Sequence, residues 1–77
     1  MDKTIREHDA VVLLRDLPEC SLVAGDTGVV VYMYDNAPAF EVEFANPVGK
    51  PRFIVLTVNA ADVLKLQPRG HAARSVA

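Results

Sequence analysis

Two carboxylates, Glu41 and Glu43, stand two positions apart in the segment AFEVEFA. Side chains two positions apart on a strand share one face at roughly 7 Å, a spacing at which paired carboxyl groups can act as acid and base in hydrolysis. The same segment alternates strictly, however, and Phe40, Val42 and Phe44 take the other face. Such alternation is typical of a half-buried strand, so we interpret the two glutamates as its solvent side.

A nucleophile or a metal site would have to use Cys20, His8 or His71, which are the only cysteine and the two histidines of the chain. Cys20 follows Glu19, whose negative charge disfavours the thiolate that a nucleophile requires. The histidines belong to opposite ends of the chain, and the sequence offers no carboxylate that would converge on both. We therefore expect no catalytic residue, no metal and no cofactor, and we interpret Cys20 as a small loop or core residue.

The segment Gly25-Asp26-Thr27-Gly28 could suggest a phosphate-binding loop. It lacks the lysine and the following helix that such a loop needs. Glycine tolerates positive φ, and aspartate can accept a hydrogen bond from its own backbone nearby. We interpret Gly25, Asp26 and Gly28 as a structural turn.

Charge is unevenly distributed along the 77 residues, whose formal net charge is −2. Residues 1–64 hold all ten acidic residues and five basic ones, whereas Lys65, Arg69 and Arg74 follow with no acid. An acidic body repels a phosphate backbone, because affinity for nucleic acid rests on clustered Lys and Arg. The sequence therefore disfavours a nucleic-acid partner.

The chain is long enough for one domain only. Its longest apolar run, Val29–Tyr34, is far shorter than the roughly 20 residues of a membrane helix, and the opening MDKTIREHDA is polar. We expect a cytoplasmic protein with no membrane contact. Three parts are expected: a polar leader over residues 1–9, a folded domain over residues 10–67, and a flexible basic tail over residues 68–77.

Turn residues divide the folded part into five short segments with strand character. These are Ala10–Arg15, Gly28–Tyr34, Ala39–Ala45, Arg52–Val58 and Val63–Gln67. We expect Leu64 and Leu66 to face inward in the last one. Asn59 is expected to cap a single helical turn before it. This order of elements predicts an all-β fold, a small SH3-like five-stranded barrel with a one-turn helix before the last strand.

Three of the predicted strands are apolar on both faces, which a small barrel has little interior to accommodate. They contain Val11–Leu14, Val29–Met33 and Phe53–Leu56. Sharply bent strands can bury both sets of side chains. Alternatively, the outer set is covered by the leader, by a second copy of the chain or by a different protein. For such a contact we predict the partner-binding residues Tyr32, Met33, Tyr34, Phe53 and Val55.

Residues 9–66 resemble a family of small bacterial proteins of unknown function that are thought to be SH3-like barrels. The resemblance rests on Leu17-Pro18-Glu19, on Ala24-Gly25-Asp26-Thr27-Gly28-Val29-Val30 and on Glu41-Val42-Glu43-Phe44. A broader similarity, through Gly25, Asp26, Gly28 and Val30, is to KOW-type barrels and to the barrel of the nitrile hydratase β subunit. The resemblance implies no catalytic or ligand-binding residue.

These observations favour a non-enzymatic protein–protein interaction module, either a homo-oligomer or the small partner of a protein encoded by a neighbouring gene. A KOW-like barrel that binds nucleic acid is one alternative. An accessory barrel of a metalloenzyme, whose catalytic subunit lies elsewhere, is another.

Overall fold

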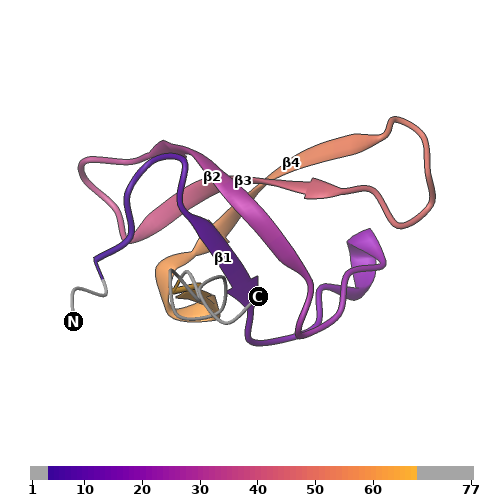
Figure 1. Cartoon of the computed structure of the whole chain (residues 1–77), viewed down its shortest axis with the longest axis horizontal. Coiled ribbons are helices and arrows are strands. Elements are labelled where there is room, and N and C mark those ends of the chain that lie inside the picture. The colour runs from indigo at the N-terminus through magenta and orange to yellow at the C-terminus, as the bar shows by residue number, and fades with distance from the viewer. Residues whose placement is uncertain (1–3, 68–77) are drawn as a thin grey trace, which may run out of the picture.

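The computed structural model describes residues 4–67 as one antiparallel sheet of five strands, with the spatial order β4-β3-β2-β1-β5 (Figure 1). Its elements are β1 (Ala10–Leu13), η1 (Pro18–Cys20), β2 (Thr27–Met33), β3 (Ala39–Ala45), β4 (Phe53–Asn59), η2 (Ala60–Asp62) and β5 (Val63–Lys65). The all-β class and the five strands are confirmed. Within the described residues the sheet is not closed, because β4 and β5 form its two edges. The predicted tail, residues 68–77, lies outside the described residues.

The predicted strand limits agree with the structure to within two residues, and those of β3 are identical. Asn59 accepts a hydrogen bond from the backbone N–H of Ala61 at 3.0 Å, so it caps the three-residue 3₁₀ helix η2 as predicted. In Figure 1 the β3–β4 hairpin projects beyond the other strands, and η1 lies on the same side of the molecule as its tip. The sheet therefore has a long free edge along β4.

The core lies on one side of the curved sheet and takes alternate side chains from each strand. Phe40, Val42 and Phe44 of β3 are buried, as the alternation of that segment predicts. The other buried apolar residues are Val11, Leu13, Leu22, Val30, Val58 and Val63. Since β3 pairs with β4 along its whole length and with β2 from Phe40 to Phe44, it is the central strand of these three.

The apolar run in β2 is explained by a β-bulge between Val30 and Tyr32. Val30 is fully buried, whereas Val31 and Tyr32 are both exposed. The extra residue shifts the register by one position, so that Met33 lies opposite Phe40 and packs against the core. A bulge therefore sends two consecutive apolar side chains of β2 outward.

The predicted orientation of the last strand is wrong. Leu64 and Leu66 are 50% and 39% exposed, and Val63 is buried instead. The register pairs Val63 with Leu13 of β1, and residues directly opposite in antiparallel strands share a face. Because Leu13 faces the core, Val63 must do so too, and the strand ends at Lys65 before Leu66 could contribute.

The long loop after β1 is anchored by Leu22, which is buried and belongs to the core. The carboxylate of Asp16 accepts a hydrogen bond from the N–H of Ala24, and that of Asp26 accepts one from the N–H of Val23. Gly25 has φ +98°, the positive value expected for the predicted turn. Two aspartates and a glycine therefore fix the path of the loop into β2.

Gly28 has a different role from Gly25, since it lies within β2 and is buried. A Cβ atom at this position would lie 2.7 Å from the carbonyl oxygen of Glu43 and 2.9 Å from a ring carbon of Phe44. Only a residue without a side chain lets β2 and β3 approach so closely.

Candidate functional site

The two glutamates of β3 lie on the outer side of the sheet, as predicted, but they have different surroundings. The Glu41 carboxylate accepts hydrogen bonds from the hydroxyls of Thr57 and Tyr34, which come from the two neighbouring segments. These hydrogen bonds, first that of Thr57, hold the pKa of Glu41 below its ordinary value of 4.5. Glu43 makes neither of these bonds. The two carboxylates therefore differ in their hydrogen-bond partners.

Glu41 in turn affects the ionisation of Tyr34. The hydrogen bond to the Glu41 carboxylate raises the pKa of Tyr34 above 10.0, because loss of the phenolic proton would set two negative charges against each other. The ring of Tyr34 also packs against that of Tyr32, edge to face, with 5.1 Å between the ring centroids. The two tyrosines and Glu41 thus form one ordered group at the end of β2.

Exposed apolar side chains lie on the outer side of β2 and β4, on either side of the glutamates of β3. We call them the outer-face cluster: Val29, Val31, Tyr32, Phe53 and Val55. Cross-strand pairing places Val29 and Val55 on either side of Glu43 in one row. Phe53 and Val55 are each 51% exposed. Burial of both faces in bent strands therefore does not account for these apolar residues.

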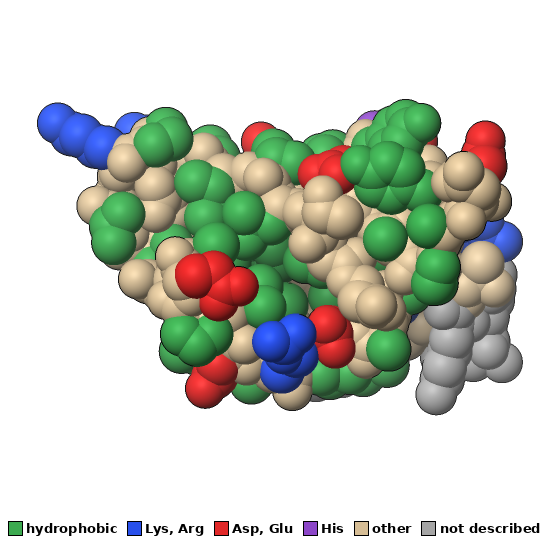
Figure 2. Space-filling view, turned by 180° about the vertical axis from the view of Figure 1, so that it is seen from behind, with side chains coloured by type: hydrophobic (Ala, Val, Ile, Leu, Met, Phe, Trp, Pro, Cys, Tyr) green, Lys and Arg blue, Asp and Glu red, His purple; other side chains and the backbone are tan. Residues whose placement is uncertain are grey.

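Figure 2 shows the molecule from behind, where hydrophobic side chains cover much of the surface and charged groups are few and scattered. Leu14, Val23, Val48 and Leu64 are also at least half exposed. Apolar exposure is thus widespread on the described part of the chain. The outer-face cluster differs from the rest in lying on β2 and β4, the two strands that pair with β3.

The five residues predicted for partner binding are not all brought together. Tyr32, Phe53 and Val55 belong to the outer-face cluster, and Tyr34 lies beside it, 37% exposed. Met33 lies apart from them, because the bulge turns it to the core side. Periodicity could not place Met33, since a bulge shifts every later side chain of the strand by one position.

The described part of the leader packs elsewhere. The ammonium group of Lys65 donates to the carbonyl oxygen of Thr4 at 3.1 Å and lies 3.3 Å from the carboxylate of Asp9. Ile5 packs against the core, and the N–H of His8 donates to the carbonyl oxygen of Val30. With residues 4–9 held in this way, the outer-face cluster stays exposed.

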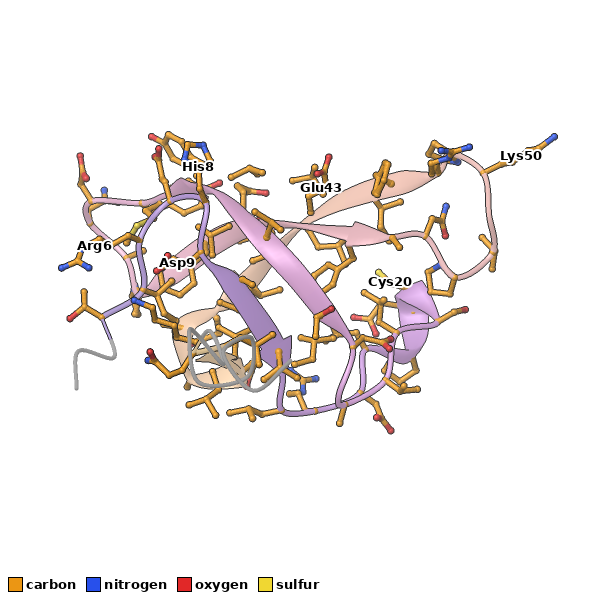
Figure 3. All side chains as sticks on the ribbon, viewed as in Figure 1. Arg6, His8, Asp9, Cys20, Glu43 and Lys50 are labelled. Carbon is orange, nitrogen blue, oxygen red and sulfur yellow. The ribbon has the colours of Figure 1, made fainter. Side chains whose placement is uncertain are left out.

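A groove of about 470 Å³ lies between η1 and β4. We call it the β4–η1 groove, and its lining residues are Glu19, Cys20, Ser21, Asn46, Val48, Ile54, Val55 and Leu56. The side chain of Cys20, the last residue of η1, lies on the side of η1 that faces the β3–β4 hairpin, as Figure 3 shows, and it packs against the core. This agrees with the small loop or core residue expected. The groove itself was not predicted from the sequence.

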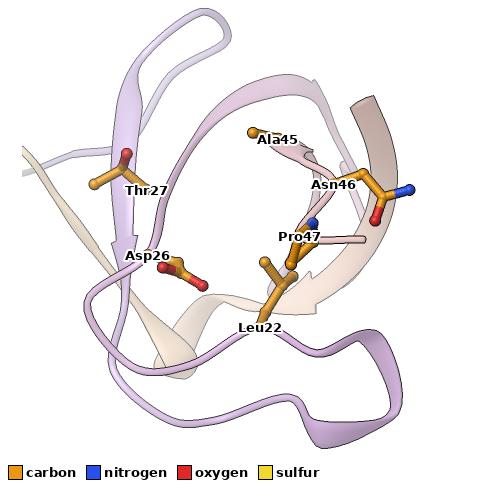
Figure 4. Close-up of a pocket in the computed structure, with 6 residues that line it drawn as sticks. All are labelled: Leu22, Asp26, Thr27, Ala45, Asn46 and Pro47. Atoms are coloured by element: carbon orange, nitrogen blue, oxygen red, sulfur yellow. The ribbon is translucent and has the colours of Figure 1, made fainter. Parts of the chain in front are cut away.

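A second hollow, of about 320 Å³, lies between the loop before β2 and the start of the β3–β4 hairpin (Figure 4). Asp26 and Thr27 line one side, and Ala45, Asn46 and Pro47 line the other. Asn46 donates to the carbonyl oxygen of Pro51 and accepts from the N–H of Val48, while Asp26 accepts from Val23. The polar groups of this hollow therefore stabilise its own turns.

His8 lies in the leader with φ +75°, and His71 lies outside the described residues. Among residues 4–67 no three side chains of the His, Cys, Asp and Glu types gather at a spacing that could hold a metal ion. Nor does any helix in that range have the length and apolar character to cross a bilayer.

These features define a small all-β protein whose five antiparallel strands form one open sheet and whose exposed apolar side chains follow β2 and β4. The chain belongs to the family described as Domain of unknown function (DUF4926), whose model matches residues 7–65. Searches of curated proteins and of solved structures gave no match.

Proposed function

We propose that this domain is a non-enzymatic protein-interaction module that binds a protein through the outer-face cluster. The observation that carries the proposal is the exposure of five apolar side chains on β2 and β4, the two strands beside β3, with Phe53 and Val55 each 51% exposed. Full burial of a side chain of this size stabilises by about 1.5–3 kcal/mol, so covering the exposed half contributes about 1 kcal/mol for each. Exposed apolar side chains that gather on one face of a protein are typical of protein contacts.

The charges of this face support a protein partner rather than a nucleic acid. The outer-face cluster surrounds Glu41 and Glu43, and no Lys or Arg occurs between Asp16 and Lys50. Phosphate groups would meet negative charge there, whereas a partner that combines apolar side chains with Lys or Arg at the positions facing Glu43 would be attracted.

The proposed architecture is that of an SH3-like barrel left open between β4 and β5. Three features support it: the strand order β4-β3-β2-β1-β5, the long loop that separates β1 from β2, and the short 3₁₀ helix before β5. In this arrangement β2, β3 and β4 form a platform for the outer-face cluster.

The test is capture of binding proteins from cells by the immobilised full chain. A variant with both Tyr32→Ser and Phe53→Ser removes two apolar side chains from the outer-face cluster. The matched control, with Leu14→Ser and Val23→Ser, removes two equally exposed apolar side chains elsewhere. We expect the wild type and the control to retain the same partner and the outer-face variant to lose it.

Thermal unfolding should show that both variants are folded, since all four positions are exposed. The proposal fails if the wild type is strictly monomeric and captures no protein. It also fails if the outer-face variant binds as well as the control.

A further inference from the structure

The hydrogen bonds at the two ends of the β3–β4 hairpin show which backbone groups of β4 point away from β3. The N–H of Asn46 donates to the carbonyl of Arg52 at 2.8 Å, and the N–H of Ala60 donates to the carbonyl of Pro38 at 2.7 Å. The register between these two pairs is constant, without a bulge. In an antiparallel ladder, hydrogen-bonded and non-hydrogen-bonded pairs alternate.

The alternation assigns the bonds of residues 53–58 in β4. Ile54, Leu56 and Val58 exchange hydrogen bonds with β3, whereas Phe53, Val55 and Thr57 lie in non-hydrogen-bonded pairs. The N–H and carbonyl groups of these last three residues therefore point to the free edge of the sheet. The strands of residues 4–67 provide no neighbour on that side, because β4 is the end of the strand order.

Edge strands usually carry features that prevent pairing with another chain, such as a lysine, a proline or a short length. The sequence of β4, FIVLTVN, has seven residues, no charge and no proline. It also combines β-branched and aromatic residues, which favour strand pairing. The edge is therefore open, long and well suited to accept another strand.

We propose that two copies of this chain pair through their β4 edges, antiparallel and centred on Val55, to form one continuous sheet across the dimer. This inference rests on the proposed interaction function and names its partner. A two-fold axis at Val55 makes the two Val55 residues exchange a pair of hydrogen bonds. It also places Phe53 opposite Thr57 of the second copy on both sides of the axis.

The charges near β4 are compatible with a second copy as the occupant. The paired segments are both neutral, so no like charges meet at the seam. The nearest carboxylates of the sheet, those of Glu43, lie one strand back in each copy. Three strand spacings separate them across the seam, about 14 Å, which exceeds the screening length of about 8 Å at physiological salt. The acidic outer face therefore opposes this pairing only weakly.

The β4–η1 groove favours the same occupant. In an added strand, alternate side chains fall on the core side of the sheet, beside the partly buried Ile54 and Leu56. In the symmetric pairing these side chains are Ile54 and Leu56 of the second copy, which lie beside the same two residues of the first, while Glu19, Ser21 and Asn46 line the rest of the groove. On the other side, Phe53 and Val55 of both copies extend the outer-face cluster.

The first measurement is the dissociation constant of the dimer, determined by sedimentation equilibrium for the wild-type full chain and for a Val55→Pro variant. Proline removes the N–H that points to the free edge but removes no hydrogen bond to β3, so the sheet should tolerate it. Because the dimer then loses two hydrogen bonds, we expect its dissociation constant to rise about 30-fold. Val55→Thr keeps the shape and the N–H, and it should dimerise within about threefold of the wild type.

The second measurement is hydrogen exchange at the amides of Phe53, Val55 and Thr57, at low and at high protein concentration. It uses the wild type and therefore does not depend on whether a variant folds. We expect protection that grows with concentration. A wild type that remains monomeric at millimolar concentration overturns the inference. So does a dimer whose three amides exchange as fast as in the monomer, or protection that appears only when another protein is added. In each case capture through the outer-face cluster still decides the proposed function separately.

Discussion

The hydroxyl of Tyr34, which directly follows the end of β2, donates a hydrogen bond to the carboxylate of Glu41 in β3. Thr57 donates to the same carboxylate from β4. A single charged side chain therefore connects three neighbouring segments on the outer side of the sheet. Its protonation state should influence the stability of the whole sheet.

The stability of the protein should fall in acid through Glu41. Its pKa is lower in the folded state than its ordinary value of 4.5. The stabilisation is therefore fully present above about pH 4.5 and is lost as the pH falls through the lower folded pKa. Urea unfolding between pH 7 and pH 3 should show a weaker pH dependence for Glu41→Gln than for the wild type. Glu43→Gln, which removes a carboxylate without these hydrogen bonds, should keep more of the wild-type dependence.

The same hydrogen bond should delay the ionisation of a phenol. The pKa of Tyr34 is raised above 10.0 by Glu41, so the stabilisation is present below that pH and is lost as the pH rises through the folded pKa. Ultraviolet titration of the wild type should show one phenol that ionises late. In Glu41→Gln that step should move to lower pH, and an unchanged titration would contradict the assigned hydrogen bond.

Gly28→Ala should destabilise the sheet. Its new Cβ would lie 2.7 Å from the carbonyl oxygen of Glu43, and the backbone there cannot move without breaking the β2–β3 pairing. We expect a loss of about 1–3 kcal/mol in the free energy of unfolding. Thr27→Ala, one position earlier and exposed, should change it by less than about 0.5 kcal/mol. Equal unfolding midpoints for the two variants would refute the close approach.

Leu22 should matter far more than its neighbour in the loop. It is 2% exposed and belongs to the core, whereas Val23 is 54% exposed. Leu22→Ala should lower the free energy of unfolding by about 2–5 kcal/mol, because it leaves a cavity. Val23→Ala should stay within about 0.5 kcal/mol of the wild type. Denaturant titration of the pair measures the difference directly.

Lys65 should determine how firmly the leader is held. Its ammonium group contacts both the carbonyl of Thr4 and the carboxylate of Asp9. Lys65→Met should keep β5 in place and make the backbone before Asp9 more accessible to hydrogen exchange and proteolysis. Arg15→Met removes the exposed ion pair with Asp62 at 3.2 Å and serves as the control. Since exposed ion pairs contribute little, the control should leave the leader unchanged.

Local signals were sufficient for the five strands and for η2, but not for η1, which lies in a segment expected to be a loop. The alternation of Phe40, Val42 and Phe44 predicts the limits and the buried side of β3, and Asn59 predicts the cap of η2. Such signals depend on a few neighbouring residues, whose backbone preferences and polarity act within one strand or one turn. The five strands and the all-β class follow from them.

Features that depend on pairing between distant segments had to come from the folded chain. Val63 rather than Leu64 faces the core because of its partner Leu13, fifty positions earlier in the chain. The bulge at Val31, which separates Met33 from the outer-face cluster, exists only relative to β3. The free edge of β4 likewise depends on which strand ends the sheet. Residue types and their periodicity decide that a segment forms a strand. Register and strand order decide where each side chain and backbone group of that strand points. Only the tertiary structure fixes register and strand order, because both are set by contacts between segments far apart in the sequence.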